Sequence, residues 1–311
     1  MPPMPKWKIA LYSCLWFIIG SPEAAEPILP LPRKHFQPPA KVALGRKLFH
    51  DPRLSGDGSL SCASCHALAK GGDDNRPLPI LASTPYPHNT PTVFNVRFNF
   101  RYHWHGDVPT LQAQAQRALQ HDMKAKWPQL LARLEADRDY AGQFSELYSD
   151  GIQRQNVLDA LIAFELSLIT PDAPFDRYLR GDSNAMTAQQ IAGYEKFKSY
   201  GCAACHQGIN IGGNLFQKLG VFRDFKGDDP GRFAVTGRER DRYVFRVPSL
   251  RNVAVTAPYF HNGKVTTLKK AVAIMGEYQL GVQLPQEDIN AIVAFLHTLT
   301  GTYLGQPVKG K

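Results

Sequence analysis

The sequence predicts a mainly α-helical protein made of two tandem units with long irregular loops. Two observations support this prediction. Apolar residues recur at helical spacing in several segments, while strand signals are few and short. The pentapeptide Cys-x-x-Cys-His also occurs twice, at residues 62–66 and 202–206. The chain has 311 residues, which is enough for two domains of ordinary size.

The two pentapeptides indicate covalently bound cofactors. Cys-x-x-Cys-His is the attachment signature of c-type haem: both thiols bond to the haem vinyl groups, and the adjacent histidine binds the iron. Zinc sites and redox-active dithiols also use paired cysteines, but neither explains a histidine after each second cysteine. We therefore expect two c-type haems and two cytochrome-c-like haem domains. The haem-binding residues are Cys62, Cys65, His66, Cys202, Cys205 and His206.

The first 25 residues have the pattern of a secretory signal peptide. Lys6 and Lys8 give a positive start, an apolar run follows over 9–19, and small residues end at Ala25. The fifth cysteine, Cys14, lies in this segment. The apolar run is short for a membrane span, although an uncleaved anchor stays open as an alternative. We expect cleavage, export to the periplasm and no stable membrane span.

The charge distribution gives no indication of nucleic-acid binding. The formal net charge is +9, from 36 basic and 27 acidic residues. The basic residues do not gather into a stripe interleaved with aromatic residues, which is the usual footprint of such proteins. A solvated basic surface is the simplest interpretation. A redox partner with an acidic docking face is the alternative.

The N-terminal haem domain is predicted over residues 26–170. Its proline-rich start, 27–39, is expected to be an extended leader that wraps this domain. Many Gly, Asp and Pro residues between 70 and 91 predict a long loop, and loops of this length are usually functional. Helices are predicted over 41–49, 111–120, 127–137 and 156–168.

The C-terminal haem domain is predicted over residues 171–311. The segment 170–182 interrupts the helical pattern and is the predicted linker. A helix over 187–200 begins with a capping signal, Thr187 followed three residues later by Gln190. The glycine-rich stretch 208–247 is expected to be irregular. Further helices are predicted over 268–275 and 286–299.

Several motifs outside the pentapeptides resemble the bacterial dihaem cytochrome c peroxidases. They are Gly-Arg-Lys-Leu-Phe-His-Asp-Pro-Arg-Leu-Ser at 45–55, Asn-Thr-Pro-Thr-Val-Phe-Asn at 89–95, Thr-Pro-Asp-Ala-Pro-Phe-Asp at 170–176 and Pro-Tyr-Phe-His-Asn-Gly at 258–263. The resemblance covers residues 30–301. The wider family contains MauG-type enzymes, which oxidise side chains of a partner protein. The resemblance implies that the C-terminal haem receives electrons, the N-terminal haem meets hydrogen peroxide, and a calcium ion lies between the domains.

The resemblance also assigns roles to individual residues. Met275 matches the distal ligand of the C-terminal haem, where a thioether raises the reduction potential. His261 is a weaker rival for this iron, since His-Asn-Gly is typical of a turn. Trp104 matches the tryptophan that lies between the haems. Oxygen atoms suit calcium, and its matched positions are Asn89, Thr256 and Pro258.

The distal side of the first haem departs from the family pattern. Family peroxidases carry a distal histidine in the loop after the first motif. Between residues 67 and 91 the sequence has a single histidine, His88, which comes later than that position. We therefore expect a five-coordinate, open iron in the N-terminal domain, as in the MauG-type enzymes.

Two further family residues lie over the first haem, a glutamine and a proton-moving glutamate. Gln114 matches the glutamine. The glutamate position aligns with Lys124, and lysine is a poor substitute unless it is strongly desolvated. Asp122 or His121 is expected to act as the general base instead.

Three functions are compatible with these patterns. The first is a periplasmic dihaem peroxidase that reduces hydrogen peroxide to water with electrons from a c-type cytochrome or a cupredoxin. The second is a MauG-type oxidase that modifies a partner protein. The third is a non-catalytic dihaem electron carrier, which an open first haem argues against. A homodimer is left open.

Overall fold

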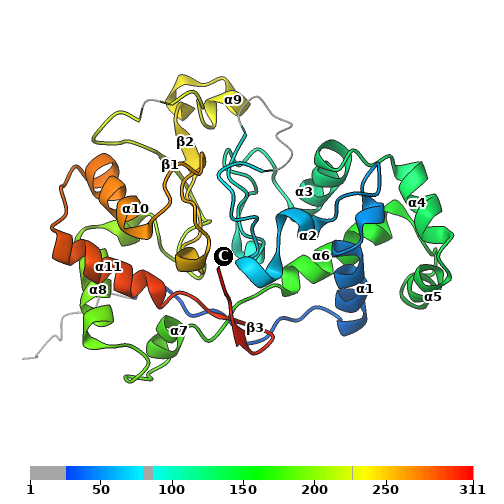
Figure 1. Ribbon diagram of the computed structural model, residues 1–311, viewed down its shortest axis with the longest axis horizontal. Coiled ribbons are helices and arrows are strands. Elements are labelled where there is room, and N and C mark those ends of the chain that lie inside the picture. Colours follow the sequence, from blue (N-terminus) through cyan, green and yellow to red (C-terminus); the bar gives the residue numbers. More distant parts are fainter. Residues whose placement is uncertain (1–25, 80–86, 226, 311) are drawn as a thin grey trace, which may run out of the picture.

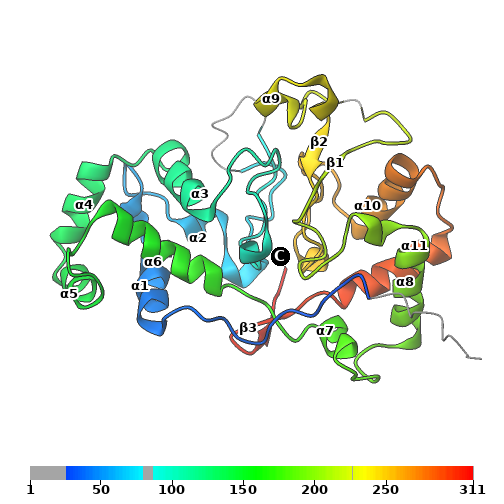
Figure 2. The same ribbon diagram turned by 180° about the vertical axis from the view of Figure 1, so that it is seen from behind.

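The computed structural model describes residues 26–79, 87–225 and 227–310. Residues 1–25, with the predicted signal peptide and Cys14, lie outside this range. The fold is mainly helical, and Figures 1 and 2 show two lobes side by side. Among the described helices, none combines the length and the apolar character that crossing a membrane requires.

One lobe contains the first half of the chain. Its helices are α1 (Pro39–Phe49), α2 (Cys62–Cys65), α3 (Leu111–Arg117), α4 (Trp127–Glu135), α5 (Arg138–Leu147) and α6 (Arg154–Ser167). Helices α1 and α6 cross closely at Gly45, where a Cβ atom would lie 2.0 Å from the carbonyl oxygen of Ala160. Only glycine permits this approach. A π-helical turn, η4 (Ala118–Asp122), continues α3.

The other lobe contains the second half. Its helices are α7 (Pro174–Leu179), α8 (Ala188–Ser199), α9 (Phe233–Thr236), α10 (Leu268–Ile274) and α11 (Gln286–His297). Helices α8 and α11 cross at Gly193, where a Cβ atom would lie 1.9 Å from the carbonyl oxygen of Ala291. Both lobes therefore pack their main helix pair through a glycine. The π-helical turn η8 (Met275–Leu280) continues α10.

Strands are short in the described part of the chain. Strand β1 (Phe216–Lys218) pairs antiparallel with β2 (Val244–Arg246), with Phe216 opposite Arg246. Strand β3 (Thr302–Tyr303) pairs in the same sense with β4 (Gln306–Pro307). The fold class predicted from the sequence, a mainly α protein of two tandem cytochrome-c-like domains, is confirmed.

The predicted helices are present with small shifts of their ends. The capping box of α8 is formed: the Thr187 hydroxyl accepts from the Gln190 N–H, and the Gln190 side chain accepts from the Thr187 N–H. Four of the described helices, α2, α5, α7 and α9, were missed. Helix α9 lies in the stretch 208–247 that was expected to be irregular. Helix α5 buries two side chains, Tyr140 and Phe144, which is too few for a clear period. Helix α7 lies within the predicted linker and begins at Pro174.

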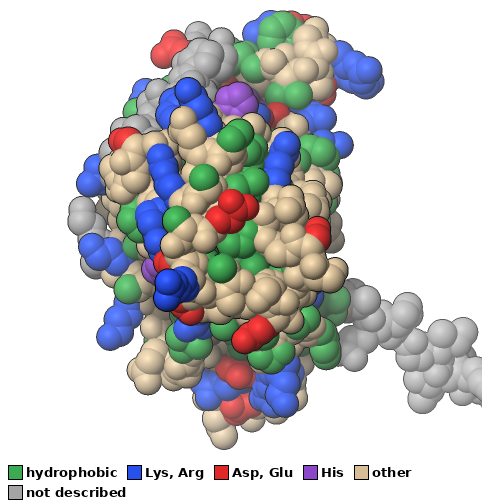
Figure 3. Space-filling view, turned by 90° about the vertical axis from the view of Figure 1, so that its right-hand side faces the viewer, with side chains coloured by type: hydrophobic (Ala, Val, Ile, Leu, Met, Phe, Trp, Pro, Cys, Tyr) green, Lys and Arg blue, Asp and Glu red, His purple; other side chains and the backbone are tan. Residues whose placement is uncertain are grey.

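The surface is mixed in character on the side seen in Figure 3. Lys and Arg side chains lie there among apolar and acidic ones, without one continuous stripe of either charge.

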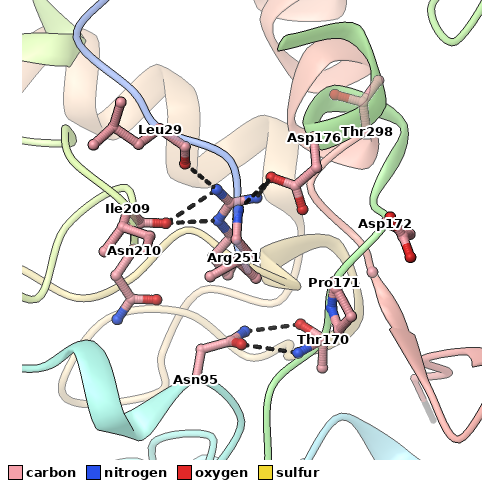
Figure 4. A network of polar contacts seen from close by, with 12 residues as sticks. Leu29, Asn95, Thr170, Pro171, Asp172, Asp176, Ile209, Asn210, Arg251 and Thr298 are labelled. Carbon is pink, nitrogen blue, oxygen red and sulfur yellow. Dashed lines mark hydrogen bonds and ion pairs between the residues drawn. The ribbon is translucent and has the colours of Figure 1, made fainter. Parts of the chain in front are cut away.

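The N-terminal leader does not wrap the first lobe, and that prediction was wrong for its first residues. The Gly208 N–H donates to the Pro27 carbonyl at 2.8 Å, and Ile28 belongs to the core of the second lobe. A buried ion pair explains this position (Figure 4): Arg251 Nη1 lies 2.6 Å from Asp176 Oδ1, and Arg251 Nη2 donates to the Leu29 carbonyl at 2.9 Å.

Each of the two hydrophobic cores contains a residue from near the opposite end of the chain, so the lobes exchange their end segments. The first core is made by residues from Leu44 to Leu168 and also contains Val308 near the C-terminus. The second core runs from Phe175 to Leu299 and also contains Ile28. This exchange ties the lobes together. The boundary at residues 170 and 171 stays a prediction.

The two halves repeat one local pattern. Residues 91–96 read Pro-Thr-Val-Phe-Asn-Val, and residues 248–253 read Pro-Ser-Leu-Arg-Asn-Val. Asn95 and Asn252 have left-handed φ angles of 60° and 61°, a conformation that asparagine tolerates. Both side-chain amides donate to Thr170 Oγ1, at 2.8 and 3.0 Å. Thr170 therefore links the two repeats.

The repeat continues at a constant offset of 157 residues, the difference between 95 and 252. A β-bridge joins Tyr102 to Val108 in the first half, and its counterpart joins Tyr259 to Val265. A threonine then caps the next helix in each half, Thr110 for α3 and Thr267 for α10. Each helix ends in a π-helical turn, which begins at residue 118 in η4 and at residue 275 in η8.

Candidate functional site: two haem cavities joined by a tryptophan

The second lobe has a cavity of about 260 Å³ around the second pentapeptide. Its wall contains Cys202, Cys205 and His206, with Met275 also in the lining. Burial lowers the pKa of His206 to about 4. The imidazole is therefore neutral at physiological pH, which is the form that binds a metal. The cavity thus contains both predicted iron ligands of the C-terminal haem.

The first lobe has a larger cavity, about 530 Å³, around the first pentapeptide. Cys62, Cys65 and His66 lie in its wall. His66 Nδ1 is 3.2 Å from the Gly72 carbonyl oxygen. A hydrogen bond at Nδ1 fixes the ring and leaves Nε2 as the nitrogen available to a metal.

The opposite wall of this cavity is supplied by α3 and η4. Gln114, Ala118 and Asp122 all line it. Lys124 is not among the described lining residues; its backbone has a φ of 54° and packs against Gly56. The structure therefore brings Gln114 and Asp122 to the cavity that contains the His66 side chain.

Ala118 and Met275 occupy equivalent positions in the repeat. Each is the first residue of its π-helical turn, and each lines the cavity of its own half. The second cavity has a thioether at this position, while the first has only a methyl group. The alanine side chain at residue 118 is too short to reach across to an iron held by His66.

Trp104 lies in the walls of both cavities. Its side chain is buried, and its indole N–H donates to the Asn89 carbonyl at 2.8 Å. This hydrogen bond fixes the ring in one orientation between the two cavities. The predicted place of Trp104 between two haems agrees with this geometry, and its role in electron transfer stays a prediction.

Comparison with known proteins identifies the family. A family model described as di-haem cytochrome c peroxidase matches residues 39–184, and a cytochrome c model matches residues 190–300. The cytochrome c551 peroxidase of Pseudomonas aeruginosa is 45% identical over 269 residues, which cover 83% of this chain and 78% of that protein. The chain belongs to the dihaem cytochrome c peroxidase and MauG family.

Other relatives of this family lie on both of its branches. The cytochrome c peroxidase Ccp of Escherichia coli is 50% identical over 287 residues, covering 89% of this chain. The chain spans 62% of the length of that relative. The methylamine utilization protein MauG of Methylorubrum extorquens is 32% identical, covering 87% of this chain and 81% of that protein. The chain is thus a peroxidase-type oxidoreductase with two c-type haem domains.

A solved structure agrees with this fold over nearly the whole chain. The crystal structure of a MauG-like protein associated with microbial copper homeostasis has a TM-score of 0.76 and 26% identity, and the match covers 96% of each chain. The diheme peroxidase BthA of Burkholderia thailandensis has the same fold, with a TM-score of 0.69, and the match covers 86% of this chain and 87% of BthA.

Arg246 shows that the cavities suit the haems of this family. It is 3% exposed and lines both cavities. Its guanidinium donates to the His103 carbonyl at 3.1 Å and to Asn99 Oδ1 at 3.4 Å, and no described carboxylate pairs with it. Burial lowers the pKa of Arg246 to about 10. A buried cation of this kind needs an anionic partner, and haem propionates would provide one.

Glu165 is a cavity residue that sequence reasoning missed. It is 7% exposed and lines the first cavity, and its Oε2 has no hydrogen-bond partner among the described residues. Burial raises the pKa of Glu165 to about 8. The side chain is therefore mostly protonated at neutral pH. The sequence did offer one indication of this residue, since it places a glutamate on the apolar face of the predicted helix 156–168.

The predicted calcium positions meet at one wall. Asn89, Thr256 and Pro258 come from segments far apart in the sequence and all line the second cavity. The Asn89 side chain donates to the Arg76 carbonyl at 2.7 Å, and the Asn89 carbonyl accepts from the Trp104 indole. Calcium at this wall stays a prediction.

The two histidines considered as alternative iron ligands, His88 and His261, line different cavities. His88 lines the first cavity, but its Nε2 lies 2.6 Å from Asp229 Oδ2. His261 lines the second cavity, and its ring stacks on Phe245 with a centroid distance of 4.3 Å. Met275 as the second ligand of the C-terminal haem iron stays a prediction.

Proposed function

We propose that this protein is a periplasmic dihaem peroxidase that reduces hydrogen peroxide to water with electrons from a small redox protein. The observation that carries this proposal is the difference between Ala118 and Met275. An alanine would leave one side of the first haem open to a small substrate. A methionine would bind the iron of the second haem, which would suit that haem to accept and hold electrons.

The two lobes then have separate tasks. When bound, c-type haem supplies an iron that binds peroxide and passes single electrons. His66 would hold the iron of the first haem, and His206 with Met275 would hold the iron of the second. Trp104 is the aromatic group in the wall that both cavities share, so it offers a short side-chain path between them. Arg246 would balance the charge of the propionates.

Gln114 and Asp122 act on the peroxide side. The amide of Gln114 can donate a hydrogen bond to a peroxide oxygen in the first cavity. Asp122 can take the proton of the incoming peroxide and return it to the departing oxygen, which is general acid–base catalysis. Each peroxide consumes two electrons and two protons and yields two waters, so a one-electron donor is oxidised twice.

A c-type cytochrome or a cupredoxin is the proposed donor. Both are small one-electron carriers of the exported compartment, and the predicted signal peptide would take this protein to the same compartment. Calcium at Asn89, Thr256 and Pro258 would hold the wall between the cavities. Oxygen ligands of this kind suit calcium.

A MauG-type oxidation of a partner protein is the second candidate. The open first haem favours it, since this branch has an open haem too, and the chain is 32% identical to one MauG. Met275 favours the peroxidase branch, because a tyrosine at that position is typical of the MauG-type proteins. A plain electron carrier does not need Gln114 and Asp122 in an open cavity.

The test is a turnover assay on the mature dihaem protein. Reduced small cytochrome c and hydrogen peroxide should be consumed in a ratio of two to one. Asp122→Asn should lower turnover by about 10²- to 10⁴-fold, the usual contribution of a general acid–base group. Lys124→Gln is the matched control and should retain turnover. The proposal would be rejected if the protein oxidised no small donor in the presence of hydrogen peroxide.

A further inference from the structure

Two histidines and an aspartate converge beside the first cavity, outside the haem-binding sets. His88 Nε2 lies 2.6 Å from Asp229 Oδ2, and His105 Nε2 lies 2.8 Å from Asp229 Oδ1. All three ligand atoms lie within 4.8 Å of one another. The side chains are largely buried, with exposed fractions of 19% for His88, 10% for His105 and 11% for Asp229.

The cluster is built from three separate segments, and each is held in place. The residue after His88 is anchored, because the Asn89 N–H donates to the His261 carbonyl at 2.7 Å. The His105 carbonyl accepts from Arg232 Nη1 at 3.0 Å. Asp229 Oδ1 accepts from the Gly231 N–H at 2.8 Å. The rings of the two histidines meet edge to face at 4.5 Å. The arrangement therefore does not depend on one flexible side chain.

We propose that His88, His105 and Asp229 form a binding site for a divalent transition-metal ion of the zinc type. Two imidazole nitrogens and one carboxylate oxygen are a common ligand set for such ions, and the fourth position is left to water or another small ligand. Calcium and magnesium prefer oxygen ligands, so this site differs in chemistry from the proposed calcium site.

The present spacing is close to what a metal requires. Ligands at zinc distances of about 2.0–2.2 Å lie roughly 3.3 Å apart in a tetrahedron. The nitrogen–oxygen separations of 2.6 and 2.8 Å are hydrogen-bond lengths, so binding moves each pair apart by about half an ångström, a small side-chain rotation for such distances. Metal binding at Nε2 leaves the ring proton of each imidazole on Nδ1, and no redox step is needed.

Two other observations fit a cation here. Asp229 is a charged ligand, because hydrogen bonds from His105 and His88 hold the pKa of its carboxyl well below its usual range despite burial. Both histidines also line the first cavity. A bound ion would thus place positive charge beside the peroxide site, while His66 and the pentapeptide cysteines stay unaffected.

Equilibrium dialysis of the mature dihaem protein against Zn²⁺ tests the proposal. Excess calcium is kept in the buffer to fill oxygen-ligand sites, and bound zinc is counted against haem iron. The wild type should bind one zinc per two irons. Asp229→Asn keeps the side-chain shape and should weaken zinc binding at least tenfold. The double variant His88→Gln/His105→Gln should abolish it. His50→Gln removes an exposed histidine and should change nothing.

The outcomes decide whether the three side chains bind a metal ion or only hydrogen-bond to one another. Failure of the wild type to bind zinc, or equal binding by wild type and Asp229→Asn, would overturn the proposal. If the variants lose their haem spectrum, zinc-edge anomalous diffraction from wild-type crystals grown with Zn²⁺ replaces them. A peak between the three side chains supports the site, and its absence rejects it.

Discussion

Ala118 and Met275 are the same position of an internal repeat, each starting a π-helical turn at the wall of its own cavity. The backbone is alike in the two halves, while the side chains differ by a thioether. Since a π-helical turn widens the helix locally, residue 275 is set where its sulfur can reach the cavity. The corresponding methyl group of Ala118 leaves that space open. Under the proposed function, the division of labour between the haems would depend on this one side chain.

Ala118→Met should convert the first haem into a copy of the second. The new thioether should reach an iron held by His66, because Met275 is proposed to bind the second iron from the equivalent backbone position. We expect the oxidised wild type to show a high-spin signal in electron paramagnetic resonance, and the variant to show only low-spin signals. Peroxide turnover should fall in parallel.

Gln112→Met is the control for Ala118→Met, because Gln112 lies on the exposed side of the same helix. It should keep the high-spin signal. His88→Ala should keep it too, since His88 Nε2 is engaged by Asp229. A wild type that is entirely low-spin and becomes high-spin in His88→Ala would show that His88 ligates the first iron and that our assignment is wrong.

Met275→His should lower the reduction potential of the second haem while both haems stay attached. A thioether favours ferrous iron more than an imidazole does. Attachment depends on Cys202 and Cys205, which the change leaves in place. A spectroscopic redox titration measures the shift. An unchanged potential would mean that Met275 is a packing residue and that another group, such as His261, binds the iron.

The sequence predicted the local features well because they depend on neighbouring residues. The capping box at Thr187 and Gln190 is set by a spacing of three residues, and the haem motifs by a spacing of four. The missed features depend on contacts between distant residues. Arg251 draws the leader to the second lobe by binding Leu29, 222 residues away. No local pattern contains that information.

The candidate site also depends on contacts between residues that are far apart in the sequence. His88 and His105 were visible as histidines, but Asp229 lies 141 and 124 residues further along the chain. Glu165 was visible as an acid in an apolar helix, yet only the fold shows that it faces a haem cavity. The sequence left Asp122 and His121 as candidate bases, and the fold adds that Asp122, the last residue of η4, lines the first cavity.

Arg246→Gln should lower the potential of at least one haem. Arg246 is a buried positive charge that lines both cavities, and no described carboxylate pairs with it. Its charge favours the reduced iron, which carries one positive charge less. Potentials should fall by about 59 mV for each tenfold loss of that preference. Arg246→Lys keeps the charge and should stay closer to the wild type. Equal potentials in the wild type, Arg246→Gln and Arg246→Lys would show that the charge of Arg246 does not tune the haems.

Glu165→Gln should remove part of the pH dependence of stability. Burial raises the pKa of Glu165 from its ordinary value of 4.5 to about 8. Between these values the folded protein binds more protons at this site than the unfolded chain does. Stability from this group is therefore complete below about pH 4.5 and is lost as the pH rises toward 8, at up to about 1.4 kcal/mol per pH unit.

Thermal unfolding of the mature protein at pH 5 and pH 8 measures this effect for wild type and Glu165→Gln. Glutamine has the same shape without a titrating proton. The two proteins should have similar stability at pH 5, and the variant should be the more stable at pH 8. Glu146→Gln, at an exposed position on α5, is the control and should follow the wild type. If Glu165→Gln loses as much stability as the wild type between the two pH values, the Glu165 carboxyl ionises freely when the haem fills the cavity.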